Sequence, residues 1–227
     1  MSPIPVSNVS LEPCWRIIPS RYPPADLLER ISSSDDWPAL ADIESLTNDR
    51  LRHETGLVNL MRPDDAVSGP GSSLIMAPFT HLDPNGDHFT DGTFGVCFAA
   101  STFEASLEWS IRRREAFLQD TNEPPINLQM RVLNMDLNGA LHDLCGDSAI
   151  DLNQMDSTRT VGCQLRGDGS YGVIFNNAVI EGARNVAVFR PSVLSNCRQE
   201  RHLAYKWDGE RIASVYDFST DQVIHQR

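Results

Sequence analysis

Two hydrophobic periods occur along this chain, and each predicts a different kind of secondary structure. Apolar residues at every second position, or short apolar runs bounded by turn residues, predict strands. A strong turn signal, Asp208-Gly209, lies between two such runs and indicates a hairpin. In chain order, strands are predicted over 14–18, 94–100, 126–137, 171–175, 186–189, 203–207 and 211–215.

Helical periodicity is concentrated in the first half of the chain. Prolines at 23 and 24 occupy the tolerated first turn of a helix that is predicted to include Ile31. A capping signal at 34–36 precedes a second helix, in which apolar residues recur at three-residue spacing. Further helices are predicted over 102–118 and 157–165. Short connected strands with helices gathered toward one end of the chain favour an α+β fold.

Length and composition favour a single domain. The chain has 227 residues, 41% of them hydrophobic, so it can bury a substantial core without disulfides or metals. We expect a flexible arm over 1–10, a domain over 11–220 and a tail over 221–227. The domain includes a helical N-terminal extension at 25–60, which is a candidate docking face, dimer contact or packing element.

The stretch 62–91 is the richest in turn-forming residues. It contains Gly69-Pro70-Gly71 and Asp83-Pro84-Asn85-Gly86. A loop of this length in a compact domain is usually functional or disordered. Apolar residues at 74–76 and Phe79 provide anchors, so we expect a functional loop.

Charge and cysteine content restrict the class of protein. The formal net charge of −12 argues against direct nucleic-acid binding, which needs a basic face. Five cysteines without C-x-x-C spacing favour reduced thiols over a disulfide framework or a zinc site, and hence a cytoplasmic protein. The N-terminus lacks a signal-peptide pattern, and no apolar run reaches the roughly 18 residues of a membrane span.

Residues 86–114 carry the most informative pattern of candidate site residues. A turn-rich loop with His88 leads into the predicted strand that contains Phe98, and the following helix carries Glu108. A polar loop residue, a strand aromatic and a helix carboxylate at these offsets are typical of a nucleotide-binding cleft built around one carboxylate. The histidines of the chain lack metal-ligand spacing with cysteine or carboxylate, so no metal site is expected.

A further pattern consists of seven segments that follow one another in order between Cys14 and Val215. They are CWRIIPSRYPP (14–24), LTNDRLRHETG (46–56), IMAPFTH (75–81), residues 86–114, YGVIFNNAV (171–179), NVAVFRP (185–191) and LAYKWDGERI (203–212). Together these segments resemble the RES-domain family, which is named for an arginine, a glutamate and a serine. The resemblance implies an ADP-ribosyltransferase-like mixed β core with NAD as the substrate. It also implies a bacterial toxin paired with an Xre-like antitoxin.

The resemblance assigns roles to five positions. The family glutamate falls on Glu108, and an early family arginine falls on Arg16, which would contact a phosphate. The other three signature positions differ from the family. His88 stands in place of the family arginine and would donate to a ribose hydroxyl. Phe98 replaces a tyrosine and would stack on nicotinamide, and Asn177 replaces the serine and would hold a phosphate or amide.

Each of these residues also has a purely structural interpretation. Glu108 can form an ion pair with Arg112 one helical turn later. The other structural alternatives are a solvated loop histidine at 88, a core aromatic at 98, a turn asparagine at 177 and a surface ion pair at 16.

Two functions follow from the resemblance and stay open on the sequence alone. In the first, the chain cleaves the nicotinamide–ribose bond of NAD by hydrolysis, phosphorolysis or ADP-ribosyl transfer. Cleavage develops positive charge on the anomeric carbon, which the carboxylate of Glu108 would stabilise. In the second, a degenerate RES protein binds a nucleotide or a partner protein without turnover. A homo-oligomer is compatible with either function.

Overall fold

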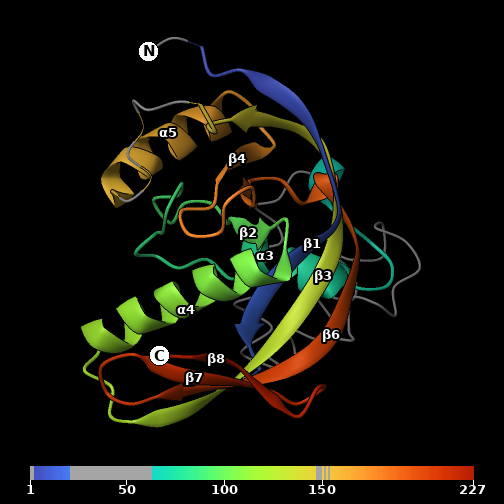
Figure 1. The fold of residues 1–227 in the computed structure, drawn as a ribbon. Coiled ribbons are helices and arrows are strands. Elements are labelled where there is room, and N and C mark those ends of the chain that lie inside the picture. Colours follow the sequence, from blue (N-terminus) through green and yellow to red (C-terminus); the bar gives the residue numbers. More distant parts are fainter. Residues whose placement is uncertain (1–2, 21–62, 147–149, 151, 153) are drawn as a thin grey trace, which may run out of the picture.

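The computed structural model describes residues 3–20, 63–146, 150, 152 and 154–227 (Figure 1). The helices predicted between 23 and 60 lie outside the described residues. The described elements are β1 (Val6–Pro19), η3 (Pro63–Asp65), α3 (Ser72–Thr80), β2 (Cys97–Ala100), α4 (Phe103–Asp120), β3 (Ile126–Asp143), α5 (Met155–Gly167), β4 (Gly172–Asn176), β5 (Arg184–Val188), η4 (Pro191–Val193), β6 (Leu194–Trp207), β7 (Ile212–Asp217) and β8 (Gln222–Gln226).

The strands form one mixed sheet in which the long strand β3 is the central element. The strand order is β1-β2-β5-β4-β3-β6-β7-β8, and β1 pairs with β3 as well, so the first five strands close into a ring. On one edge β3 pairs antiparallel with β1. On the other edge it pairs antiparallel with β6 and then, at His142 and Asp143, parallel with β4. The β6–β8 strands therefore extend from the ring as an antiparallel arm, visible at the bottom of Figure 1.

Helix α4 packs against the sheet, where it contacts β1, β2, β5 and β7. It begins where Thr102 accepts a hydrogen bond from the Ala105 amide, which satisfies one of the unpaired N–H groups at the helix start. Leu107, Ile111 and Leu118 form its buried side and join a cluster with aromatic residues of β6. Burial of this face fixes how α4 is rotated about its axis.

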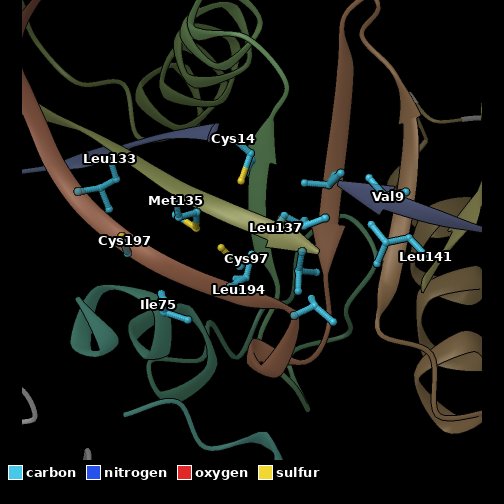
Figure 2. Close-up of a cluster of buried hydrophobic side chains, with 14 of the residues drawn as sticks. Val9, Cys14, Ile75, Cys97, Leu133, Met135, Leu137, Leu141, Leu194 and Cys197 are labelled. Carbon is cyan, nitrogen blue, oxygen red and sulfur yellow. The ribbon is translucent and has the colours of Figure 1, made fainter. Parts of the chain in front are cut away.

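The largest buried cluster lies between the ring strands and α3 (Figure 2). Three of the five cysteines meet there, Cys14, Cys97 and Cys197, all of them buried. Burial raises the pKa of the Cys14 and Cys97 thiols, so both stay protonated and pack as small apolar groups. All five cysteines are present as thiols, with no disulfide bond between them.

The α+β fold class predicted from the sequence is confirmed, together with most element positions. The predicted hairpin around Asp208-Gly209 is the β6–β7 turn. The helices predicted at 102–118 and 157–165 are α4 and α5, each slightly longer than expected.

Both ends of the chain are more ordered than the sequence predicts. Residues 6–10, expected in a flexible arm, belong to β1 and pair with β3 from Asn138 to His142. The expected tail contains β8, which pairs with β7. Neither stretch has a strong apolar alternation of its own, so the sequence gives no local signal for a strand there. Each stretch is ordered by pairing along one edge of a strand whose position is set by the rest of the sheet.

The stretch 62–91 is only partly a loop. Its apolar anchors belong to α3, which contains Pro78. The helix begins directly after Gly71, whose backbone is in the left-handed conformation. Proline and the run of glycine and serine residues favour a loop locally, whereas burial of Ile75, Met76 and Phe79 in the core stabilises the helix. The remaining loop, residues 81–96 between α3 and β2, is called the cavity loop below.

Close packing between the cavity loop and α5 generates a stability prediction. Gly162→Ala should destabilise the fold by about 1–3 kcal/mol, because a methyl group there would meet the Phe89 backbone. Urea unfolding followed by circular dichroism measures the change. Gly167→Ala, at the end of the same helix, is the control, since no described atom lies within 4 Å of its Cβ position and alanine favours helix. Equal losses in the two variants would contradict this packing.

Candidate functional site: a cationic cavity beside α4

A cavity of about 290 Å³ opens between β1, the cavity loop, β2 and α4. This volume is just below the roughly 300–1,000 Å³ that small-molecule sites occupy. Its lining brings three arginines, Arg16, Arg113 and Arg114, together with the aromatic residues Phe98 and Trp109. Guanidinium groups next to aromatic faces suit a ligand that carries both negative charge and a planar ring.

Helix α4 contributes one continuous stripe to the cavity wall. With 3.6 residues per turn, positions three, four, seven and eight apart lie on the same helix face. Glu108 falls on the other side of the helix and is absent from the described residues that line the cavity. The lining residues of α4 are Ser106, Trp109, Ser110, Arg113 and Arg114.

Arg16 is fixed against the floor of the cavity by strand β2. Its Nη1 donates to the Phe98 carbonyl oxygen at 2.9 Å and lies 3.5 Å from the Cys97 sulfur. The rest of the planar guanidinium has donors left for a ligand. The sequence-predicted residues Arg16 and Phe98 therefore line the same cavity, from neighbouring strands.

The cavity loop is held in place by side chains from α4 and α5. Arg159 of α5 donates to the Asn85 carbonyl oxygen at 2.7 Å, and Arg113 of α4 forms an ion pair with Asp87. Phe89 adopts a left-handed backbone conformation, with φ of 62°, and its ring is buried. The loop thus places the ring of Phe89 in the core and the carboxylate of Asp87 at the cavity wall.

His88 lies behind the cavity wall, between α4 and α5. Its Nδ1 is 3.1 Å from the Thr158 hydroxyl, and its ring lies 5.9 Å from the Trp109 ring. The Thr158 hydroxyl is also 3.0 Å from the Met155 carbonyl oxygen, to which it can donate its single proton. We therefore assign the proton of the neutral imidazole to Nδ1, which leaves Nε2 as an acceptor.

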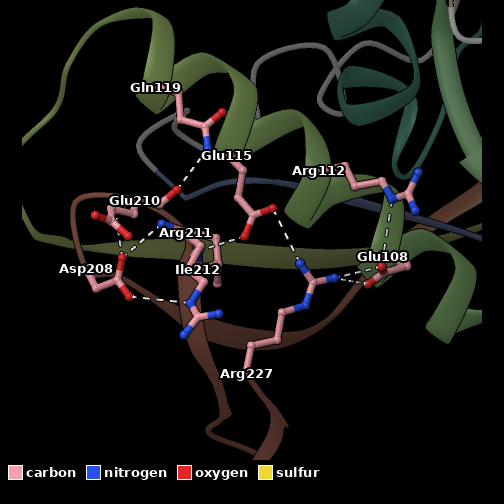
Figure 3. Close-up of polar contacts among 9 residues, drawn as sticks. All are labelled: Glu108, Arg112, Glu115, Gln119, Asp208, Glu210, Arg211, Ile212 and Arg227. Atoms are coloured by element: carbon pink, nitrogen blue, oxygen red, sulfur yellow. Dashed lines mark hydrogen bonds and ion pairs between the residues drawn. The ribbon is translucent and has the colours of Figure 1, made fainter.

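Glu108 takes part in a polar network on the outer side of α4 (Figure 3). Its Oε1 accepts from Arg227 Nη2 at 2.9 Å, and Arg112 Nε lies 3.8 Å away. Arg227 also approaches Glu115, whose second oxygen accepts from the Ile212 amide at 2.8 Å. Glu108 thus forms the ion pair with Arg112 that its spacing allows, and a shorter one with Arg227.

Asn177 closes the turn between β4 and β5. Its side-chain oxygen accepts from the amides of Val179 and Ile180 at 2.9 and 2.8 Å. Its side-chain nitrogen donates to the Asn185 side-chain oxygen at 3.2 Å. These contacts correspond to the turn role that the sequence left open for this residue, and Asn177 does not appear among the described residues of the cavity wall.

The structure adds site residues that sequence reasoning missed. Trp109, Arg113 and Asp87 all line the cavity beside Arg16 and Phe98. Trp109 is surrounded by aromatic rings, and its indole N–H is buried without a hydrogen-bond partner in the described part of the chain. The sequence signal for these two residues is that Trp109 and Arg113 are four positions apart and so lie on one face of a helix. That face could be recognised as the cavity side only once the buried side of α4 was known.

Comparison with known proteins identifies the family. The RES domain family matches residues 62–208, so the chain belongs to the RES domain family. The uncharacterized protein y4oC of Sinorhizobium fredii (strain NBRC 101917 / NGR234) is 36% identical over 204 residues, which cover 90% of this chain and 86% of that protein.

Among solved structures, the chain is similar to one described as the crystal structure of the M. tuberculosis MbcT-MbcA toxin-antitoxin complex. The TM-score is 0.47 at 13% identity, with 90% of this chain and 87% of that chain covered. Within the described residues, no group of three or more His, Cys, Asp or Glu side chains could hold a metal ion. The described helices are also too short or too polar to span a membrane.

The environment of His88 predicts its titration. Burial lowers the pKa of His88 from its ordinary value near 6.5, Arg113 and Arg159 lower it further, and Asp87 opposes them. An NMR titration should place the pKa of His88 below 6.5, with Arg113→Gln raising it and Asp87→Asn lowering it. Because the unfolded chain binds this proton more readily, the folded state should lose stability as pH falls below about 6.5. A pKa at or above 6.5 would contradict this environment.

Proposed function

We propose that this RES domain protein binds NAD in the cavity beside α4 and cleaves its nicotinamide–ribose bond. The observation that carries the proposal is the lining of the cavity, where Arg16 and Arg113 lie with the aromatic residues Phe98 and Trp109. A dinucleotide offers phosphates to the guanidinium groups and a planar ring to the aromatic face. One half of the dinucleotide would fill a cavity of about 290 Å³, with the other half toward its opening.

The proposed chemistry needs a carboxylate at the developing positive charge. Loss of nicotinamide leaves an oxocarbenium-like ribose, which a nearby anion stabilises most strongly where water is excluded. The family pattern assigns this role to Glu108. In the structure the Glu108 carboxylate pairs with Arg227 on the side of α4 that faces away from the cavity, so the proposal requires this pair to open and α4 to turn Glu108 toward the substrate when it binds.

The proposed biological setting is that of a bacterial toxin acting on cytoplasmic NAD. A protein of this kind needs a partner that keeps it inactive, and the family resemblance points to an Xre-like antitoxin. An antitoxin that covers the cavity opening would exclude the dinucleotide. Water, phosphate or a protein side chain would accept the ADP-ribose.

The enzyme proposal predicts that Glu108→Ala lowers the rate of NAD loss by about 100-fold or more, the usual effect of removing one group that stabilises transition-state charge. NAD consumption by the purified protein, with and without phosphate, measures the rate and tests phosphate as acceptor. Glu104→Ala is the matched control, because Glu104 is exposed in the first turn of the same helix. Unchanged NAD loss in Glu108→Ala would overturn the assigned role.

A second function, nucleotide binding without turnover, is favoured by one specific observation. Glu108 is held by Arg227 and Arg112 rather than at the cavity wall. In this case the protein binds NAD, or a partner protein at the cavity opening, and does not consume the nucleotide.

The second function predicts that restoring the family residues creates NAD turnover absent from the parent. His88→Arg, Phe98→Tyr and Asn177→Ser should be combined, and NAD loss measured against the unmodified chain. Because Asn177 closes the β4–β5 turn, the double variant that keeps this asparagine controls for a damaged fold. A parent that already consumes NAD as fast as either variant would reject this function.

A further inference from the structure

We propose that Arg113 is the phosphate-recognising residue of the cavity, and that Asp87 occupies its guanidinium until a ligand phosphate takes the place of the carboxylate. This inference rests on the proposed function in one respect, namely that the cavity accepts a phosphate-bearing ligand such as a dinucleotide. It adds the residue that selects the phosphate and the internal group that competes with it.

Three contacts define the position of Arg113. It projects from α4 into the cavity lining, and its guanidinium carbon lies 5.1 Å from the centre of the Phe98 ring. Its Nη2 forms a close ion pair with Asp87 Oδ2. A guanidinium that stacks by its face keeps its edge donors directed sideways, so Phe98 orients the fork of donors that Asp87 engages.

The ion pair between Arg113 and Asp87 is partly exposed to solvent. The two side chains are 38% and 21% exposed. An exchange of Asp87 for a ligand oxyanion therefore carries a smaller desolvation penalty than it would at a fully buried pair, because water reaches both groups. A phosphoryl group offers two oxygens to the guanidinium fork, which a single carboxylate oxygen does not match.

Asp87 can release Arg113 without releasing the cavity loop. Its other oxygen, Oδ1, accepts from the His88 amide at 2.8 Å. The loop is also tied to α5, where Arg159 donates to the Asn85 carbonyl oxygen. The loop backbone therefore keeps its anchors when Oδ2 is displaced, and only one ion pair has to exchange.

A second guanidinium in the cavity extends this site. Arg16 uses Nη1 on the Phe98 carbonyl oxygen, so its position is fixed before a ligand arrives. Arg113 and Arg16 thus reach Phe98 from different sides, one at the ring and one at the backbone. Two guanidinium groups that line one cavity are suited to the two phosphates of a pyrophosphate.

The test compares variants whose expected effects have opposite signs. Isothermal titration with NAD and, separately, with inorganic pyrophosphate should show binding weakened about 10- to 100-fold by Arg113→Gln, which removes charged hydrogen bonds. Asp87→Asn removes the competing charge but keeps an acceptor for the His88 amide. It should tighten binding about two- to fivefold. Arg211→Gln, on the exposed β6–β7 turn, is the control and should bind like the parent.

A structural role of the ion pair predicts a different result. If Arg113 only fixes the loop, Asp87→Asn weakens binding as Arg113→Gln does, and this outcome overturns the inference. Arg113→Lys separates charge from geometry, because lysine keeps the charge but loses the planar fork and should bind less tightly than the parent. Thermal unfolding of each variant establishes that binding is compared between folded proteins.

The binding test separates this inference from the proposed function. Tight NAD binding with the opposite-sign pattern but no NAD loss supports Arg113 and removes the enzyme proposal. Pyrophosphate binding with that pattern but no NAD binding supports Arg113 as a phosphate site and rejects NAD as the ligand. Failure of the parent to bind either NAD or pyrophosphate overturns the assignment of Arg113.

Discussion

The pairing of β3 along both of its edges is the constraint on which the rest of the molecule depends. One edge holds β1, and the other holds β6 and then β4. Because β1 also pairs with β2, β2 with β5, and β5 with β4, this one strand closes the ring. The ring places Arg16 of β1 beside Phe98 of β2, although their positions in the sequence are 82 apart. The cavity floor is thus a product of strand pairing.

Helix α4 then divides the charged groups between two environments. Its apolar side is buried against β6 and β7, so its rotation is fixed and its two polar stripes face different ways. One stripe carries Trp109 and Arg113 to the cavity, and the other carries Glu108 and Glu115 to Arg227 (Figure 3). The arginine at the cavity and the carboxylate of the family signature therefore lie on different faces of one helix. The C-terminal strand takes part in this separation, since Arg227 follows β8 directly.

The cavity loop joins these two parts through close backbone packing. Phe89 inserts its ring among aromatic residues behind the cavity, and its backbone passes so close to Gly162 that no side chain fits there. That insertion directs His88 toward Thr158 and Trp109, and directs Asp87 toward Arg113. A histidine at this position is thereby partly buried, and this burial lowers its pKa.

The sequence alone determined the α+β class, the RES family and the positions of α4, α5 and the β6–β7 hairpin. These depend on local periodicity, capping and turn residues, which are properties of neighbouring positions. It also identified Arg16 and Phe98, which the fold does bring together. Tertiary structure decided the ends of the sheet, the helix α3 within a loop-like segment, and the direction in which Glu108 points. Those outcomes depend on which strand edge or helix face is buried against distant residues, and no local pattern encodes that partner.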